Sequence, residues 1–196
     1  MQPVHAYLNA RLYWTQPKAL TRSYELHANA PGSDVIVALL SFEHPFGSLA
    51  CGQTTTGWWT FKRVGFFKPA VTVRARGREE NVAVYHPRWS GTEGEISTGH
   101  GTYTFKTANF WGTRYEILDA GGNLLITYRS GCPDASLSDF FKSQSTVTLT
   151  DAGRDEQLID LLVVVGWYLI VLNREDTAAI AATSGVVVPH STSNCA

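Results

Sequence analysis

The sequence predicts an all-β protein: a closed antiparallel barrel of about twelve strands around one hydrophobic α-helix near the C-terminus. Three observations lead to this prediction. Short runs of β-branched and aromatic residues recur along the chain, separated by Gly, Pro, Asn and Asp. One long apolar run follows them. The length of 196 residues suits a single domain, because barrels commonly fill this size range.

The expected strands are short and follow one another closely. They span residues 5–14, 22–28, 35–42, 48–53, 57–62, 70–76, 81–86, 95–99, 102–107, 113–118, 123–129 and 145–149. The clearest hairpin runs from Tyr115 to Ile126, where Gly121 and Gly122 can supply the positive φ angles of a tight reversal. Residues 135–142 predict one or two helical turns, because their apolar side chains share one helical face.

An internal repeat supports a barrel built from hairpins. Residues 59–77 align without gaps on residues 103–121, and Phe67 falls opposite Trp111. The spacing between the copies approaches that of a propeller blade, which is about 40–45 residues. The chain would hold only a few such blades, and its last part does not fit one. Repeated hairpins of one closed barrel therefore explain the repeat better.

The apolar run differs from the strands in length and pattern. It extends over residues 158–172, lacks alternation, and lies between Asp155-Glu156 and Asn173-Arg174, charges that suit the two ends of a helix. Apolar residues occupy every side of this helix, so we expect it to be enclosed. Burying each large side chain is worth about 1.5–3 kcal/mol before chain entropy is counted. The expected domain is residues 1–176, with the helix at about 155–173 and a partly disordered tail at 177–196.

A membrane span is the alternative for this run. The unbroken apolar stretch from Leu161 to Leu172 is about 18 Å of helix, at roughly 1.5 Å per residue, which is short for a bilayer core. Extending the stretch backwards would place Asp160 in hydrocarbon, which is costly. A buried core helix is therefore the favoured interpretation.

A dozen short strands followed by one wholly apolar helix resembles the tubby-like barrel superfamily, which includes tubby C-terminal domains, LURP-one-related proteins and phospholipid scramblases. The residues that carry the resemblance are Gly57–Arg63, Tyr115–Leu125 and Leu158–Leu172. The resemblance implies a closed barrel around a central helix. It also implies that basic residues on the barrel exterior can bind phosphoinositides.

Composition excludes several classes of protein. The formal charge of −1 gives no reason to expect a nucleic-acid partner, and six Trp argue against a disordered chain. Cys51, Cys132 and Cys195 are too few and too widely spaced for a disulfide framework or a zinc cluster. The first ten residues lack the basic start and apolar core of a secretory signal. We expect a cytoplasmic protein, either free or bound peripherally to a membrane.

Motifs for catalysis are missing from the sequence. It contains no GxSxG, HExxH, phosphate-loop or GxGxxG motif. His44, His86 and His100 fit turns or strand ends, and none has a ligand partner at metal-binding spacing. The acidic residues before the apolar run fit a helix start: Asp151, Asp155, Glu156 and Asp160. We therefore expect no enzyme activity, no cofactor and no metal.

Charge is distributed unevenly along the chain, and a run of basic residues is the one group whose chemistry suggests a binding site. No acidic residue lies between Glu43 and Glu79. On a strand at 70–76, Arg74, Arg76 and Arg78 would point outward about 6.7 Å apart, and Lys62 and Arg63 would lie on the neighbouring strand. Guanidinium groups bind phosphate in bidentate fashion. A solvated strand face is the alternative interpretation.

The sequence therefore predicts a non-enzymatic binding or scaffold module that recognises anionic lipid headgroups of the phosphoinositide type. The predicted site is the exterior row Lys62, Arg63, Arg74, Arg76 and Arg78. One alternative is a scramblase-like membrane protein anchored by residues 158–172. Another is a small-molecule-binding barrel of the lipocalin kind, which would need an empty lumen.

Overall fold

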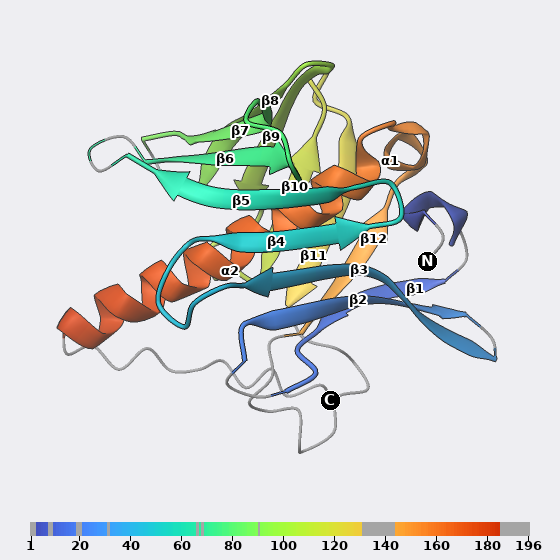
Figure 1. Ribbon diagram of the computed structural model, residues 1–196, viewed down its shortest axis with the longest axis horizontal. Helices are drawn as coiled ribbons and strands as arrows, with labels where there is room; N and C mark the ends of the chain where they lie inside the picture. Colours follow the sequence, from blue (N-terminus) through green and yellow to red (C-terminus); the bar gives the residue numbers. More distant parts are fainter. Residues whose placement is uncertain are drawn as a thin grey trace.

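The computed structural model describes residues 3–184, apart from residues 8–9, 19–20, 31, 66, 68, 90 and 131–143. The helical turns expected at 135–142 lie outside the described residues, as do Cys132 and Cys195. Within the described residues the chain forms one closed antiparallel barrel of twelve strands with a helix through its centre, which confirms the predicted fold class (Figure 1).

The strands follow one another around the barrel in chain order, and β1 closes the ring against β12. Their bounds are β1 Arg11–Thr15, β2 Ser23–Ala30, β3 Ser33–Phe42, β4 Ala50–Thr54, β5 Trp58–Val64, β6 Ala70–Ala75, β7 Asn81–Pro87, β8 Glu93–Thr98, β9 Gly101–Thr107, β10 Arg114–Leu118, β11 Leu124–Ser130 and β12 Ser145–Leu149. Short helices occupy η1 Val4–Ala6 and α1 Asp151–Asp155, and α2 is Ile159–Ser184.

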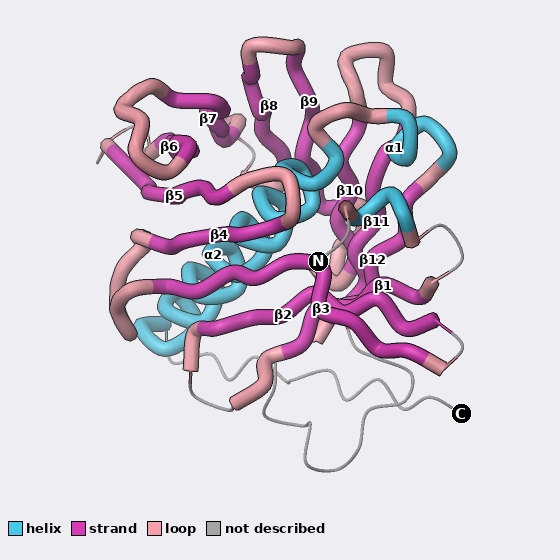
Figure 2. Tube along the Cα trace, turned by 45° about the vertical axis from the view of Figure 1, so that its right-hand side comes forward, coloured by secondary structure: helices cyan, strands magenta, loops and turns pink. Residues whose placement is uncertain are grey.

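Alternation of burial along the strands directs apolar side chains into the lumen. On β6, for example, Val71 and Val73 are buried whereas Thr72 and Arg74 face outward. A twelve-stranded barrel is too wide for its own side chains to fill. The first half of α2 fills it, and every residue from Ile159 to Leu172 is buried (Figure 2). Enclosure explains why this helix has no polar side over these residues.

Aromatic rings join the helix to the barrel wall. Trp167 stacks on Trp14 of β1, with ring centroids 5.6 Å apart, and meets Tyr24 of β2 edge to face. The next residue along α2, Tyr168, stacks between Phe42 of β3 and Phe61 of β5. These contacts fix the rotation of α2 as well as its depth, because flat rings fit only in a few orientations.

The structure corrects both ends of the predicted helix. The chain forms α1 at residues 151–155, with Thr150 as its N-cap, and turns into extended backbone at Glu156 before α2 begins at Ile159. At the other end α2 continues to Ser184, so residues 177–184, expected to belong to the tail, are helical. The alanine-rich sequence there favours a helix outside the barrel. Among the described residues, no helix has the length and apolarity of a transmembrane span.

The first expected strand also begins later than predicted. Residues 4–6 form the 3₁₀ helix η1, and β1 starts only at Arg11. Val4 is fully buried in the core, and its backbone N–H donates to the Asp160 carboxylate at 3.0 Å. The second Asp160 oxygen accepts from the Thr56 hydroxyl at 2.9 Å. The N-terminal segment thus closes the barrel where α2 begins.

We expect Asp160→Ala to lower the free energy of unfolding by about 2–3 kcal/mol, because the buried Val4 N–H would lose its acceptor. Urea denaturation of the full chain measures this loss. Asp155→Ala is the matched control, since the Asp155 side chain is exposed at the end of α1. Equal stabilities of the two variants would show that the Asp160 contacts contribute nothing.

Candidate functional site

The two ends of the barrel differ in their connections. At one end, which we call the loop end, residues 16–22, 43–49, 65–69, 88–92 and 108–113 connect the strands. At the opposite end, the turn end, the connections are residues 31–32, 55–57, 76–80, 99–100 and 119–123. The helix α2 begins at the turn end, where Asp160 meets Thr56, and leaves the barrel at the loop end (Figure 1).

Three of the five predicted basic residues lie on the exterior of the hairpin β5–β6. Lys62 is paired in register with Thr72, and Arg74 with Thr60, so both basic side chains are on the outer side of the sheet. Arg76 follows the end of β6, and its N–H donates to the Trp58 carbonyl at 2.8 Å. We call Lys62, Arg74 and Arg76 the basic face.

Arg63 does not belong to the basic face, which corrects the prediction. It is paired in register with the buried Val71 and therefore has the inward orientation, at the loop end of β5. There its guanidinium donates both to Asp176 Oδ1 at 3.0 Å and to Asp176 Oδ2 at 2.7 Å. Hydrogen bonding to this carboxylate raises the pKa of Arg63. Through this ion pair, Arg63 links the end of β5 to α2.

Arg78 also departs from the predicted row, because the strand ends at Ala75. The chain reverses at Gly77, which has a φ of +77°, and the Arg78 N–H donates to the Ala75 carbonyl at 3.0 Å. Arg78 therefore lies in the turn beside the exposed Glu79 and Glu80, whose charges offset its own.

The guanidinium groups of the basic face are positioned by neutral partners. Arg74 Nε donates to the Asn81 side-chain oxygen at 3.0 Å, and the Arg76 guanidinium lies 4.3 Å from the centre of the Trp58 ring. Among the described residues, no carboxylate forms an ion pair with Lys62, Arg74 or Arg76. All three side chains are exposed and keep their charge available to a ligand.

A second group of charges surrounds α2 where it leaves the barrel. Arg22 donates to Glu175 at 2.7 Å, and its guanidinium lies 3.8 Å from the centre of the Phe42 ring. Arg174 donates to the Ser130 hydroxyl at 2.8 Å and lies over the Trp167 ring. Burial lowers the pKa of Arg174 and raises that of Glu175. These contacts close the barrel mouth around the helix.

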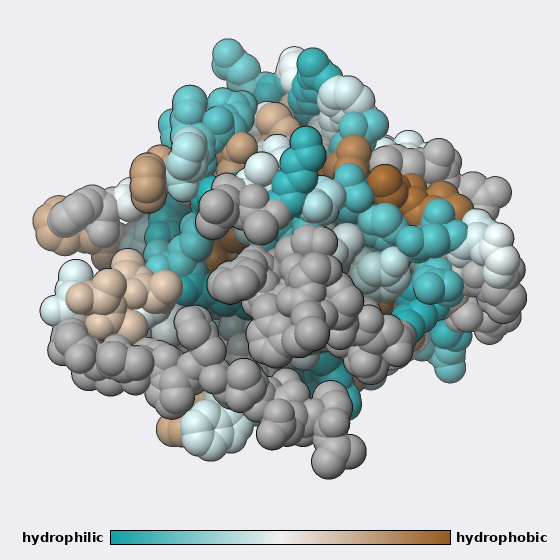
Figure 3. All heavy atoms as spheres, turned by 90° about the horizontal axis from the view of Figure 1, so that it is seen from below, coloured by the Kyte–Doolittle hydropathy of each residue, from teal (hydrophilic) through white to brown (hydrophobic). Residues whose placement is uncertain are grey.

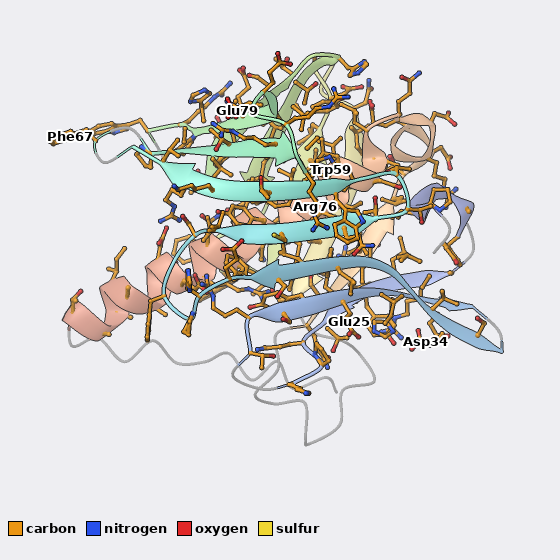
Figure 4. The ribbon with its side chains drawn as sticks, in the orientation of Figure 1. Glu25, Asp34, Trp59, Phe67, Arg76 and Glu79 are labelled. Atoms are coloured by element: carbon orange, nitrogen blue, oxygen red, sulfur yellow. The ribbon has the colours of Figure 1, made fainter. Side chains whose placement is uncertain are left out.

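Sequence reasoning missed a set of exposed aromatic residues at the loop end. They lie on four successive loop-end connections, and the exposed fraction of each residue is between 79% and 104%. We call them the aromatic rim: Phe46, Phe67, Trp89, Phe110 and Trp111. Figure 4 shows Phe67 projecting away from the barrel, far from Asp34 at the opposite end. The repeat held part of this signal, since it aligned Phe67 with Trp111.

The two ends also carry opposite charge. Each end is taken to comprise its connections, the two strand residues on either side of every connection, and the helical residues beside them. Among the described residues, the loop end holds the basic Lys18, Arg22, Arg63, Arg88, Lys106, Arg114, Arg129 and Arg174 and the acidic Glu43, Glu93, Glu175 and Asp176. The turn end holds the basic Arg11, Arg74, Arg76, Arg78 and Arg154 and the acidic Asp34, Glu79, Glu80, Asp119, Asp151, Asp155, Glu156 and Asp160. The loop end is thus net positive and the turn end net negative.

A histidine held between carboxylates lies on the exterior of β1–β3 and was also missed. His27 Nδ1 is 3.0 Å from Asp34 Oδ2, and Nε2 is 3.1 Å from Glu25 Oε2. The Tyr13 ring stacks on His27, with centroids 5.3 Å apart. Adjacent strands bring these residues together. In the sequence, only the predicted pairing of these strands could have indicated the cluster. The array orients the imidazole and leaves it no free ring nitrogen.

The other predicted chemical residues are scattered. His100 lies in the β8–β9 turn, and Asp151 pairs with Arg154 within α1. Cys51 is an exposed free thiol on β4, and burial together with the neighbouring Glu43 raises its pKa, which disfavours the reactive thiolate. In the described part of the chain, no three His, Cys, Asp or Glu residues come together as metal ligands would.

The fold and these surfaces define a closed antiparallel barrel filled by its own helix. Comparison with known proteins adds no family to this description: no family model, no curated protein and no solved structure matches this chain.

Proposed function

We propose that this chain is a non-catalytic binding module that recognises the phosphate groups of anionic phospholipids at a membrane surface. The observation that carries the proposal is the basic face: three exposed cations on one hairpin, without a carboxylate partner among the described residues. Unpaired cations on one side of a sheet repel each other, and an anionic ligand removes this repulsion.

The chemistry of the basic face suits phosphate. Arg74 and Arg76 are held from the side by Asn81 and Trp58, so their remaining N–H groups can approach phosphate oxygens with less loss of side-chain freedom. Charge-assisted hydrogen bonds from guanidinium to phosphate are frequently bidentate. Lys62, on the neighbouring strand, adds a third charge on the same surface.

The filled lumen supports an exterior ligand. Side chains of α2 occupy the interior from Ile159 to Leu172, which argues against a lipocalin-like chamber for a small molecule. The same packing argues against residues 158–172 as a membrane anchor, because their release would expose a dozen buried apolar side chains. Membership of the tubby-like superfamily stays a prediction.

The test is binding of the full chain to phosphatidylcholine vesicles that contain a phosphoinositide. We expect Arg74→Ser/Arg76→Ser to weaken binding roughly tenfold or more, since each cation near an anionic surface contributes about 1 kcal/mol. Outward surface changes should leave the melting temperature within a few degrees. Flotation measures the bound fraction, and binding should fall as salt rises above 0.1 M, where screening acts within about 10 Å.

Arg11→Ser/Arg154→Ser is the matched control. It removes the same charge at the same end of the barrel, but from β1 and α1 rather than from the basic face. Equal weakening in both double variants would indicate an effect of net charge alone and would contradict the site. Failure of the unaltered chain to bind these vesicles would overturn the proposed function.

A further inference from the structure

The aromatic rim is a feature that folding does not explain. Phe46, Trp89 and Phe110 are almost fully exposed at the tips of three different loop-end connections, and Phe67 occupies a fourth. At the turn end, by contrast, the exposed aromatic residue among those described is Trp58. It is only 46% exposed, and the Arg76 guanidinium lies over its ring. Large apolar side chains held in water at one end of a molecule mark a surface for a partner.

The arrangement of the rim favours a lipid surface over a folded protein. A protein hot spot is a packed, contiguous patch that fits a pocket of its partner. Here the aromatic side chains stand on four different connections, with Phe110 and Trp111 packed edge to face on one of them, and Figure 3 shows small separate apolar groups at the left-hand edge, which is the loop end. Separate projections can each enter a fluid bilayer, and Trp and other aromatic rings settle at the membrane–water interface.

Charge complementarity points to an anionic bilayer. Over the described residues the loop end is net positive and the turn end net negative, so a negative membrane surface attracts the rim. At the turn end it attracts the basic face and repels the acidic residues. Lys18 and Arg129 are exposed at the loop end, and no carboxylate forms an ion pair with either among the described residues. The basic face runs along the exterior of the hairpin β5–β6, from Lys62 near the connection that carries Phe67 to Arg74 and Arg76 at the turn end.

We propose that the loop end docks on an anionic phospholipid bilayer, with the aromatic rim inserted into its interfacial region. This inference rests on the proposed function and adds the docking surface and orientation to it. The barrel then lies tilted on its β5–β6 side, so that the rim enters the interface while Lys62, Arg74 and Arg76 along this hairpin meet the headgroups. Insertion is the part of binding that salt does not screen, because it depends on apolar burial.

The experiment removes the rings on two connections of the rim and measures flotation with the same phosphoinositide-containing vesicles. We expect Trp89→Ser/Phe110→Ser/Trp111→Ser to weaken binding at least tenfold at low salt and to abolish the binding that survives at high salt. His100→Ser is the matched control, an exposed ring in the β8–β9 turn at the turn end, and should bind as the unaltered chain does. Near-UV circular dichroism checks that each variant folds.

A conservative variant separates insertion from mere contact. Trp89→Phe/Trp111→Phe keeps apolar rings on the rim and should bind within about threefold of the unaltered chain. It should also lose the blue shift in tryptophan emission that vesicles induce, because the remaining tryptophans lie away from the rim. A blue shift that persists would contradict insertion.

The outcomes distinguish this inference from the proposed function. Unaltered binding by the rim variant, with loss of binding by the basic-face variant, would overturn the docking surface and keep the phospholipid ligand. Absence of vesicle binding by the unaltered chain would overturn both, and would leave a protein partner as the reason for the exposed rim.

Discussion

Val165→Asp is expected to prevent folding of the chain. Val165 is fully buried at the middle of the enclosed part of α2, and the residues on either side of it are buried as well. An ionised carboxylate there would have no cationic partner, and an unpaired buried charge costs several kcal/mol. Because domains are stable by only about 5–15 kcal/mol, this loss removes most or all of the folding free energy.

Soluble yield and the thermal unfolding curve of the purified chain measure the effect. Ala178→Asp is the control for the same side chain on the same helix, since Ala178 is exposed beyond the barrel mouth. It should fold and lose less than about 1 kcal/mol. Val165→Thr keeps the shape of valine and its hydroxyl can bond to the helix backbone, so it should fold with reduced stability. A native melting curve for Val165→Asp would contradict the central role of α2.

The barrel was predictable because local patterns determine most of it. The two-residue alternation on strands such as β6 and the uninterrupted apolar run before Asn173 can both be read without knowing any contact. The start of α2 was predicted wrongly because it depends on tertiary contacts. Asp160 must reach Val4 and Thr56, and a break after α1 allows this.

The candidate site was only partly predictable. Alternation along a strand places adjacent residues on opposite sides, but the end of β6 at Ala75, which removes Arg78 from the row, could not be read from the sequence. Lys62 and Arg63 are neighbours in sequence, yet one faces solvent and the other pairs with Asp176 of α2. The aromatic rim could have been found from the order of hairpins, since alternate connections of an antiparallel barrel lie at the same end. The charge difference between the ends could be seen only after the strands were placed.

Gly166 marks a close approach between α2 and the barrel wall. A Cβ atom at this position would clash with the Tyr128 hydroxyl oxygen and would lie 2.7 Å from its ring carbon Cζ. The hydroxyl donates to the Val163 carbonyl at 3.0 Å, with the Leu162 carbonyl at 3.3 Å. The absence of a side chain at Gly166 therefore gives Tyr128 of β11 room to reach the helix backbone.

Gly166→Val is expected to lower the free energy of unfolding by about 3 kcal/mol or more, because the side chain would overpack the core. On an exposed helix the same change would raise helix stability by a few tenths of a kcal/mol. Urea denaturation decides between these opposite signs. A variant as stable as the unaltered chain would show that α2 and β11 can separate without cost.

A second variant tests whether Tyr128 is the side chain in conflict. Tyr128→Leu removes the phenol ring and its hydrogen bond, and alone it should be destabilising because it leaves a cavity under Gly166. Combined with Gly166→Val, the new methyl groups occupy that cavity. The double variant should therefore be more stable than the sum of the single effects predicts, by a coupling energy of about 1–3 kcal/mol. Additive losses would place the conflict elsewhere in the lumen, on a residue other than Tyr128.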